Sequence, residues 1–249
     1  MNSVLETMGL CKNFGALTVA DQINFRLEAG TRHALIGPNG AGKTTFVNML
    51  MGGLAPSSGS ILLGGLDVTQ QSQRERVKRG LGRTFQINTL FRNLAVVDNV
   101  ALAIAERLGV GSDMFRPAKH HRAVINESMA VLESLGLGAD ARLHVSALPY
   151  GKQRLVEIAI ALGMRPKVLL LDEPAAGIPS MESHLILEVL DTLPADIAIL
   201  IIEHDMDLVF RFARKITVLA QGAVLMEGSP GEVAADERVR QVYLGERHG

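Results

Sequence analysis

The sequence predicts an α/β protein in which a mixed, mostly parallel sheet carries an antiparallel β subdomain and an inserted helical lobe. Three patterns support this prediction. Unbroken runs of Ile, Leu and Val alternate with helical segments, as in parallel sheets whose two faces are covered by helices. Segments near the N-terminus instead alternate apolar and polar residues, and a long middle stretch has helical periodicity alone.

The strands are expected from two kinds of pattern. Residues 4–10 and the alternation within residues 23–27 predict an antiparallel sheet with one face in water. Continuous apolar runs predict parallel strands that are buried on both faces, and these runs are residues 32–36, 168–172 and 197–202. The chain returns to strand patterns at residues 216–219 and 223–226.

The helices are expected between and after these strands. Residues 88–164 lack a convincing strand pattern, so we expect them to form the helical lobe, while residues 1–87 and 165–249 form the sheet core. Within the lobe, residues 124–135 have helical spacing and Gly136 can end that helix. Further helices are predicted at residues 155–164 and 185–193 and after Ser229, where Pro230 and Glu232 complete a helix-start signal.

The composition narrows the class of protein. With 25 basic and 26 acidic side chains, the near-zero net charge gives no electrostatic case for a nucleic-acid partner. The single cysteine, Cys11, allows no internal disulfide and is expected to be a packing residue in a reducing cytosol. The longest apolar run, residues 197–202, is far shorter than the roughly 20 residues that span a bilayer, and no secretory signal opens the chain. We therefore expect a soluble cytoplasmic protein.

The first chemical motif lies between an apolar strand and an apolar helix. Residues 37–45 read Gly-Pro-Asn-Gly-Ala-Gly-Lys-Thr-Thr and match the phosphate-binding pattern G-x-x-x-x-G-K-[ST]. The glycines let successive backbone N–H groups surround an anion, Lys43 would reach the β- and γ-phosphates, and the Thr44 hydroxyl would bind Mg²⁺. The alternative is a glycine-rich turn that happens to fit. The candidate nucleotide-binding residues are Gly37, Pro38, Asn39, Gly40, Ala41, Gly42, Lys43, Thr44 and Thr45.

The second motif is a pair of carboxylates at the end of the buried strand 168–172. The carboxyl ends of the strands of an α/β sheet present groups to a ligand. Asp172 would hold Mg²⁺ through water, and Glu173 would orient or deprotonate an attacking water molecule. The alternative is an ordinary strand end with solvated acids, which the pairing with a phosphate loop disfavours.

The third motif reads Leu-Pro-Tyr-Gly-Lys-Gln-Arg over residues 148–154, directly before an apolar helix. The order of phosphate loop, Gln86, this motif, Asp172-Glu173 and His204 resembles the ATP-binding subunits of ABC transporters over nearly the whole chain. The resemblance implies a P-loop NTPase fold, forming a single ABC ATPase domain over residues 1–249. It also implies hydrolysis of ATP, with Mg²⁺ as cofactor, coupled to transmembrane transport.

The third motif is similar to the signature sequence of that family, typically Leu-Ser-Gly-Gly-Gln. The resemblance implies a head-to-tail dimer in which Tyr150, Gly151 and Lys152 of one subunit cap the γ-phosphate held by the other. A helix N-terminus suits this role, because its free N–H groups and its dipole favour an anion. Pro149 stands where many members have serine, and Pro179 stands near where an aspartate is common, so these cross-subunit contacts differ from the usual ones.

Three more residues are assigned by resemblance. Phe14 matches the aromatic residue that stacks on adenine, and its alternative is a core phenylalanine. Gln86 matches the catalytic glutamine that senses Mg²⁺ and water, and its alternative is a solvated strand end. His204 matches the switch histidine that contacts the γ-phosphate, and its alternative is a structural histidine at a strand end.

A narrower resemblance comes from the Arg-Thr-Phe-Gln segment at 83–86, the Tyr-Gly form of the signature, residues 173–177 and the ending at 243–246. Together they are similar to branched-chain amino-acid importer ATPases of the LivG type. The implied partners are a second, identical or different, ATP-binding subunit, membrane permease subunits that dock near Phe91 and Leu94, and indirectly a solute-binding protein. The protein would then lie on the inner face of the cell membrane.

Three other functions are weighed against this one. The chain could serve another ABC transporter, such as a lipopolysaccharide exporter. It could be a soluble ABC-type ATPase that acts on nucleic acid or the ribosome, although the neutral charge and the lack of a long coiled coil disfavour this class. A P-loop small-molecule kinase fits least, because it would need neither the signature nor Glu173.

Overall fold

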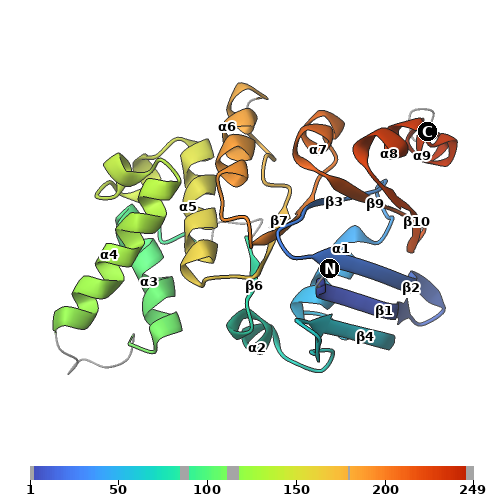
Figure 1. Ribbon diagram of the computed structural model, residues 1–249, viewed down its shortest axis with the longest axis horizontal. Helices are drawn as coiled ribbons and strands as arrows, with labels where there is room; N and C mark the ends of the chain where they lie inside the picture. The colour runs from blue at the N-terminus through green and yellow to red at the C-terminus, as the bar shows by residue number, and fades with distance from the viewer. Residues whose placement is uncertain (1–2, 85–89, 111–117, 179, 245–249) are drawn as a thin grey trace. The chain divides into compact units, whose positions relative to one another are not determined.

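The computed structural model describes residues 3–84, 90–110, 118–178 and 180–244 of the chain (Figure 1). It divides into two compact units. The first contains residues Met1–Leu81, Lys167–Glu173 and Pro194–Gly249, and the second contains Gly82–Pro166 and Pro174–Leu193. The second unit thus takes in the expected helical lobe together with residues 174–193, which we had expected in the sheet core. The reason is packing, since helix α6 (Ser180–Asp191) lies against helix α5 (Tyr150–Gly163) of the second unit.

The first unit contains an antiparallel sheet of four strands in the order β2-β1-β4-β5. The strands are β1 (Ser3–Phe14), β2 (Leu17–Glu28), β4 (Ser58–Leu63) and β5 (Leu66–Asp67). The expected alternation is confirmed in β2, where Ile23, Phe25 and Leu27 are buried and the residues between them are exposed. Strands β4 and β5 lie outside the patterns used to predict strands.

A second sheet of six strands has the order β10-β9-β3-β8-β7-β6. The strands are β3 (Arg32–Ile36), β6 (Leu81–Arg83), β7 (Val168–Asp172), β8 (Ala198–Ile202), β9 (Lys215–Ala220) and β10 (Ala223–Gly228). As expected for parallel strands covered on both faces, β3, β7 and β8 pair in parallel and every residue in them is buried. Strand β10 pairs with β9 in the antiparallel sense, so the sheet is mixed.

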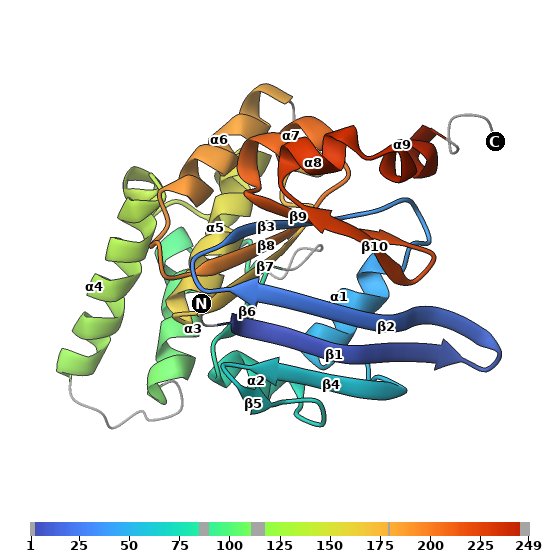
Figure 2. The ribbon, with the colours of Figure 1, turned by 45° about the vertical axis from the view of Figure 1, so that its right-hand side comes forward.

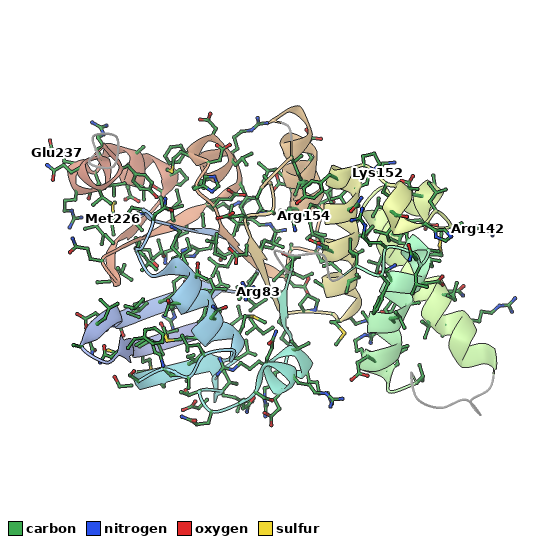
Figure 3. All side chains as sticks on the ribbon, turned by 180° about the vertical axis from the view of Figure 1, so that it is seen from behind. Arg83, Arg142, Lys152, Arg154, Met226 and Glu237 are labelled. Atoms are coloured by element: carbon green, nitrogen blue, oxygen red, sulfur yellow. The ribbon has the colours of Figure 1, made fainter. Side chains whose placement is uncertain are left out.

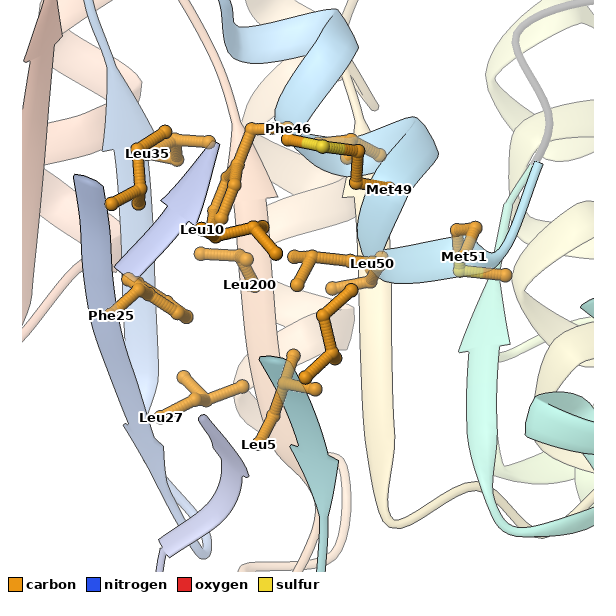
Figure 4. Close-up of a cluster of buried hydrophobic side chains, with 14 of the residues drawn as sticks. Leu5, Leu10, Phe25, Leu27, Leu35, Phe46, Met49, Leu50, Met51 and Leu200 are labelled. Carbon is orange, nitrogen blue, oxygen red and sulfur yellow. The ribbon is translucent and has the colours of Figure 1, made fainter. Parts of the chain in front are cut away.

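The core of the first unit lies between the two sheets. Helix α1 (Lys43–Met51) runs between them, and helices α7 (Met206–Phe212), α8 (Pro230–Ala235) and α9 (Glu237–Leu244) lie on the other side of the six-stranded sheet (Figure 2). Phe46 and Leu50 of α1 reach the same cluster as Leu10 and Phe25 of the antiparallel strands and Leu200 of β8 (Figure 4). This packing fixes the start of α1 relative to the ends of the parallel strands.

A buried arginine holds the other end of α1. Arg76, in helix α2 (Gln73–Lys78), is only 1% exposed. Its guanidinium group donates to the Met49 and Leu50 carbonyls, each at 2.6 Å, and to the Thr69 and Gln71 carbonyls at 2.9 and 3.1 Å. The last carbonyls of a helix lack intrahelical donors and carry its negative dipole end, so a cation is favourable here.

The second unit is helical, as expected. Helices α3 (Val96–Leu108), α4 (Ala118–Ser134) and α5 pack against one another, and the described residues between 90 and 166 form no strand beyond an isolated bridge between Ala95 and His144. Gly136, with φ 72°, follows α4 as the expected stop. No helix in the described part of the chain is both long and apolar enough to cross a bilayer.

Candidate nucleotide site

The loop between β3 and α1 requires glycine at two positions. Gly42 has φ 97°, and a Cβ atom there would lie 2.6 Å from the Val19 carbonyl oxygen. A Cβ atom on Gly37 would lie 2.3 Å from the Leu219 carbonyl oxygen. Both distances are shorter than any real contact, so neighbouring backbone segments hold the loop in a conformation that only glycine adopts without strain. The loop is therefore shaped before any ligand binds.

Lys43 begins α1 and turns back over the loop. Its Nζ atom donates to the carbonyl oxygens of Gly37 and, at 2.9 Å, Pro38. No acidic residue occupies the first turn of α1. The start of the helix thus combines an ammonium group, a positive dipole end and backbone N–H groups that no side chain caps, which is the chemistry of an anion site. Thr44 and Asn39 are exposed at the same end.

The two carboxylates lie at the end of β7, where Asp172 is the last residue of the strand and Glu173 follows it. Strand β8 separates β7 from β3, the strand that leads into the phosphate loop. Strand β8 pairs with both β3 and β7, so the ends of these three strands share one edge of the sheet. Asp172 is 7% exposed. Glu173 has φ 46°, an uncommon conformation for a non-glycine residue, and its N–H donates to the Ile202 carbonyl at 2.9 Å. Backbone strain of this kind concentrates at functional sites, where the surrounding structure holds it in place.

His204 lies beside Glu173, two residues after the end of β8. Its Nδ1 atom is 3.8 Å from Oε1 of Glu173 and 3.9 Å from Oε2 of Glu203. The imidazole side chain is 69% exposed, whereas Glu203 is 3% exposed. The fold therefore brings together Asp172, Glu173 and His204, which are distant in sequence. It adds Glu203, which had no expected role, although a carboxylate at the end of a buried strand was a signal that could have singled it out.

Phe14 ends β1 and is not a core residue. Its side chain is 50% exposed, and the ammonium group of Lys12 lies 5.0 Å from the ring centroid. The ammonium group lies over the ring, and because the ring is half exposed it is available to stack on a planar ligand. The alternative of a packed core phenylalanine is thereby excluded.

The signature residues lie at the start of α5, in the second unit. The helix begins at Tyr150, five residues before the predicted start, with Pro149 as its N-cap residue. No side chain caps this end, so the first N–H groups of the helix are open to an anion. Lys152 is paired with Asp140 at 2.6 Å, and the Arg154 guanidinium carbon lies 5.3 Å from the centroid of the Tyr150 ring (Figure 3).

Two expected site positions, Gln86 and Pro179, lie outside the described residues. Within the described residues, no group of three or more His, Cys, Asp or Glu side chains could hold a metal by itself. Thr44 and Asp172 nevertheless fit Mg²⁺, because this ion takes oxygen ligands and commonly uses one or two carboxylates together with phosphate and water.

Comparison with known proteins identifies the family of this site. The family model described as ABC transporter matches residues 20–176. The chain belongs to the ABC transporter family. A second family model, for the branched-chain amino acid ATP-binding cassette transporters, matches residues 223–249 of this ABC ATPase.

Curated relatives match the ABC ATPase over almost its whole length. The chain is 35% identical to the high-affinity branched-chain amino acid transport ATP-binding protein BraF of Pseudomonas aeruginosa, with 98% of each protein covered. It is 36% identical to LivG, of the same description, from Escherichia coli, again over 98% of each. The lipopolysaccharide export ATP-binding protein LptB of Acidithiobacillus ferridurans is 35% identical over 99% of each.

Solved structures agree with the assignment of the fold. The crystal structure of the ADP conformation of MJ1267, an ATP-binding cassette of an ABC transporter, is 28% identical, with a TM-score of 0.86 over 98% of this chain and 100% of that one. The structure of cbiO1 from Clostridium perfringens is 29% identical, with a TM-score of 0.81, and the match covers 100% of this chain and 96% of that one. The expected P-loop ABC ATPase fold is confirmed, and the chain is an ATPase whose hydrolysis of ATP is coupled to transport.

Proposed function

We propose that this ABC ATPase binds Mg·ATP, acts in a dimer of ATP-binding subunits, and drives a membrane permease that imports branched-chain or related amino acids. The observation that carries the catalytic part is the single sheet edge shared by the phosphate loop, Asp172, Glu173 and His204. The match of residues 223–249 to the branched-chain amino acid family model supports the cargo.

The catalytic roles follow from the chemistry of each group. Lys43 exchanges its contacts with loop carbonyls for the β- and γ-phosphate oxygens, which are stronger acceptors because they are charged. Thr44 and Asp172 would hold Mg²⁺, and the bound ion would neutralise phosphate charge. Glu173 then orients the attacking water and accepts its proton, and its constrained backbone keeps the carboxylate at the sheet edge.

The remaining ligand contacts follow the same logic. Phe14 would stack on the adenine ring, and Gln86 keeps the role that the family resemblance implies, as the glutamine that senses Mg²⁺ and water. The start of α5, with Tyr150, Gly151 and Lys152, caps the γ-phosphate held by the other subunit of the dimer. The open N–H groups of α5 supply this contact without the serine hydroxyl that Pro149 lacks.

A groove on the second unit suits the permease. It has a volume of about 350 Å³ and is lined by Leu94, Asp98, Ala101, Leu102, Ala105, Val110, Val124 and Ile125. Leu94, Leu102 and Ile125 are exposed apolar side chains, and Phe91, next to the groove in sequence, is 59% exposed. Exposed apolar clusters of this kind mark protein contacts. A short amphipathic segment of a permease would bury these side chains and leave its polar face in water.

Glu173→Gln tests the catalytic part of the proposal. This variant keeps the size of the side chain and removes the base, so ATP binding should persist while turnover falls by roughly 10²- to 10⁴-fold. Steady-state hydrolysis and equilibrium nucleotide titration measure the two quantities separately. Turnover near the wild-type rate would reject the role of Glu173.

The cargo is tested in cells that depend on this chain for the transporter. When Glu173→Gln replaces the wild type, uptake of radiolabelled leucine should fall while uptake of glucose stays unchanged. The LptB relative supports lipopolysaccharide export as a second candidate. Unchanged leucine uptake together with loss of lipopolysaccharide from the cell surface would favour that candidate.

A further inference from the structure

Glu203 occupies the central position of the sheet edge that carries the site. It directly follows β8, whose Leu200 and Ile202 pair with His33 and Leu35 of β3 on one side and with Leu170 and Asp172 of β7 on the other. The backbone of Glu203 therefore lies between the phosphate loop and the carboxylate pair. At 3% exposure it is a buried acid, and a buried carboxylate is costly unless it accepts hydrogen bonds.

Two contacts of the Glu203 carboxylate involve His204. Its Oε2 atom accepts the backbone N–H of His204 at 3.2 Å and lies 3.9 Å from the imidazole Nδ1. The same Nδ1 is 3.8 Å from Oε1 of Glu173. Both imidazole distances are longer than a hydrogen bond, so a small movement of the exposed ring brings Nδ1 onto either acid.

The two acids differ in their exposure to solvent. The side chain of Glu173 is 35% exposed, whereas that of Glu203 is 3% exposed and is fixed by its contact with the backbone. One Nδ1–H proton can be donated to only one of them at a time. When Glu203 accepts it, Glu173 is left for the attacking water and the opposite ring nitrogen, Nε2, is turned away from the acids.

We propose that Glu203 is a positioning residue that accepts the Nδ1–H of His204. It thereby fixes the tautomer of His204 and directs Nε2 to the terminal phosphate. Carboxylates commonly orient functional histidines in this way, through the nitrogen that does not touch the reacting group. The inference rests on the proposed catalytic roles of Glu173 and His204. It adds a role for Glu203, which has none in the proposed function.

A double-mutant cycle tests the proposal. Glu203→Ala should lower kcat for ATP about 10-fold, the lower end of the effect of losing an orienting partner, and should leave KM within about 2-fold. Glu203→Gln should retain most of kcat, because its amide oxygen still accepts a hydrogen bond from Nδ1–H. In a His204→Ala background, Glu203→Ala should cause less than about 2-fold further loss, since coupled residues are not additive.

A spectroscopic readout separates positioning from a structural role. In protein labelled with ¹⁵N-histidine at alkaline pH, the His204 ring should carry its proton on Nδ1 in the wild type and shift toward Nε2–H in Glu203→Ala. Glu232→Ala is the matched control. It also removes a carboxylate that accepts a backbone N–H, from Ser229 at 2.7 Å, but in α8, outside the site, and it should leave kcat and the His204 signal unchanged.

Two results would overturn the inference. One is a loss of kcat by Glu203→Ala that is equally large with and without His204, which would show that Glu203 acts by another route. The other is an unchanged His204 tautomer in Glu203→Ala. Failure of the proposed function is a separate result, because it appears as absent ATP turnover in the wild type or as normal turnover in Glu173→Gln.

Discussion

The buried histidine that precedes the phosphate loop predicts a specific loss of stability in acid. His33 lies on β3 and is completely buried, and its ring centroid lies 5.1 Å from that of Phe25, with the two rings tilted at 58° to each other. Its Nε2 lies 2.8 Å from Oγ1 of Thr217, whose hydroxyl donates to Oε2 of Glu227 at 2.8 Å. The hydroxyl proton is thus already used, so Nε2 carries the proton that His33 donates. Nδ1 is left as a bare acceptor with no partner among the described residues.

Protonation of this ring is unfavourable in the folded protein. Burial is the main cause, and together with the charge of Lys215 it outweighs the opposing charge of Glu227, so the pKa of His33 falls from 6.5 to about 4. In the unfolded chain, His33 binds its proton near pH 6.5. The contribution of His33 to the free energy of unfolding is therefore fully present above that pH and is lost as the pH falls toward 4. The linkage relation gives a loss of about 2 kcal/mol in unfolding free energy at pH 5, and almost none at pH 7.5.

His33→Gln isolates this effect, because glutamine can still donate to Thr217 but does not titrate. Urea unfolding followed by far-UV circular dichroism suits the chain, which contains no tryptophan. Between pH 7.5 and pH 5 the wild type should lose about 2 kcal/mol more unfolding free energy than the variant. Equal losses in the two proteins would refute the reasoning, since carboxylates elsewhere affect both alike.

Three further predictions concern single positions. Phe14→Ala should weaken ATP binding by about 1–2 kcal/mol, measured by calorimetry, while Phe14→Tyr keeps the ring and should bind as the wild type does. Arg76→Met should lower the unfolding free energy by at least about 3 kcal/mol, because four backbone carbonyls lose their donor, two of them in buried and two in part-buried hydrogen bonds; a change below 1 kcal/mol in urea titrations would contradict this. Gly42→Ala should abolish nucleotide binding, since its Cβ would meet the Val19 carbonyl, whereas Gly64→Ala, where a Cβ would meet nothing within 4 Å, should bind normally.

Much of the fold could be predicted because its signals are local. The helix start at Ser229, Pro230 and Glu232 is confirmed with both hydrogen bonds of a capping box, since all the groups involved lie within four residues. Runs dominated by Ile, Leu, Val and Ala predicted β7 and β8 as buried parallel strands, because a strand covered on both faces has no polar alternation. Strand β3 was predicted in the same way, although it begins with the buried polar residues Arg32 and His33. The phosphate loop was also recognisable from a local signal, because its glycines, Lys43 and Thr44 all lie within one short loop of nine residues, 37–45.

The elements that escaped prediction depend on distant partners. Strand β4, with a glycine and two serines at its start, has a weak pattern and exists because it pairs with β1, about fifty residues earlier. Helix α5 begins at Tyr150, where Pro149 sets the N-cap, although the apolar periodicity starts only later. The assignment of residues 174–193 to the second unit follows from the packing of α6 on α5, which no local pattern records.

For the site, the sequence by itself determined which groups are present: the phosphate loop, Asp172, Glu173 and His204. Only the tertiary structure decided their geometry, including the φ of 46° at Glu173 and the placement of Glu203 beside His204. The physical reason is that residue types and short spacings are encoded locally. The meeting of three strand ends depends instead on long-range pairing of β3, β8 and β7, which only the folded chain establishes.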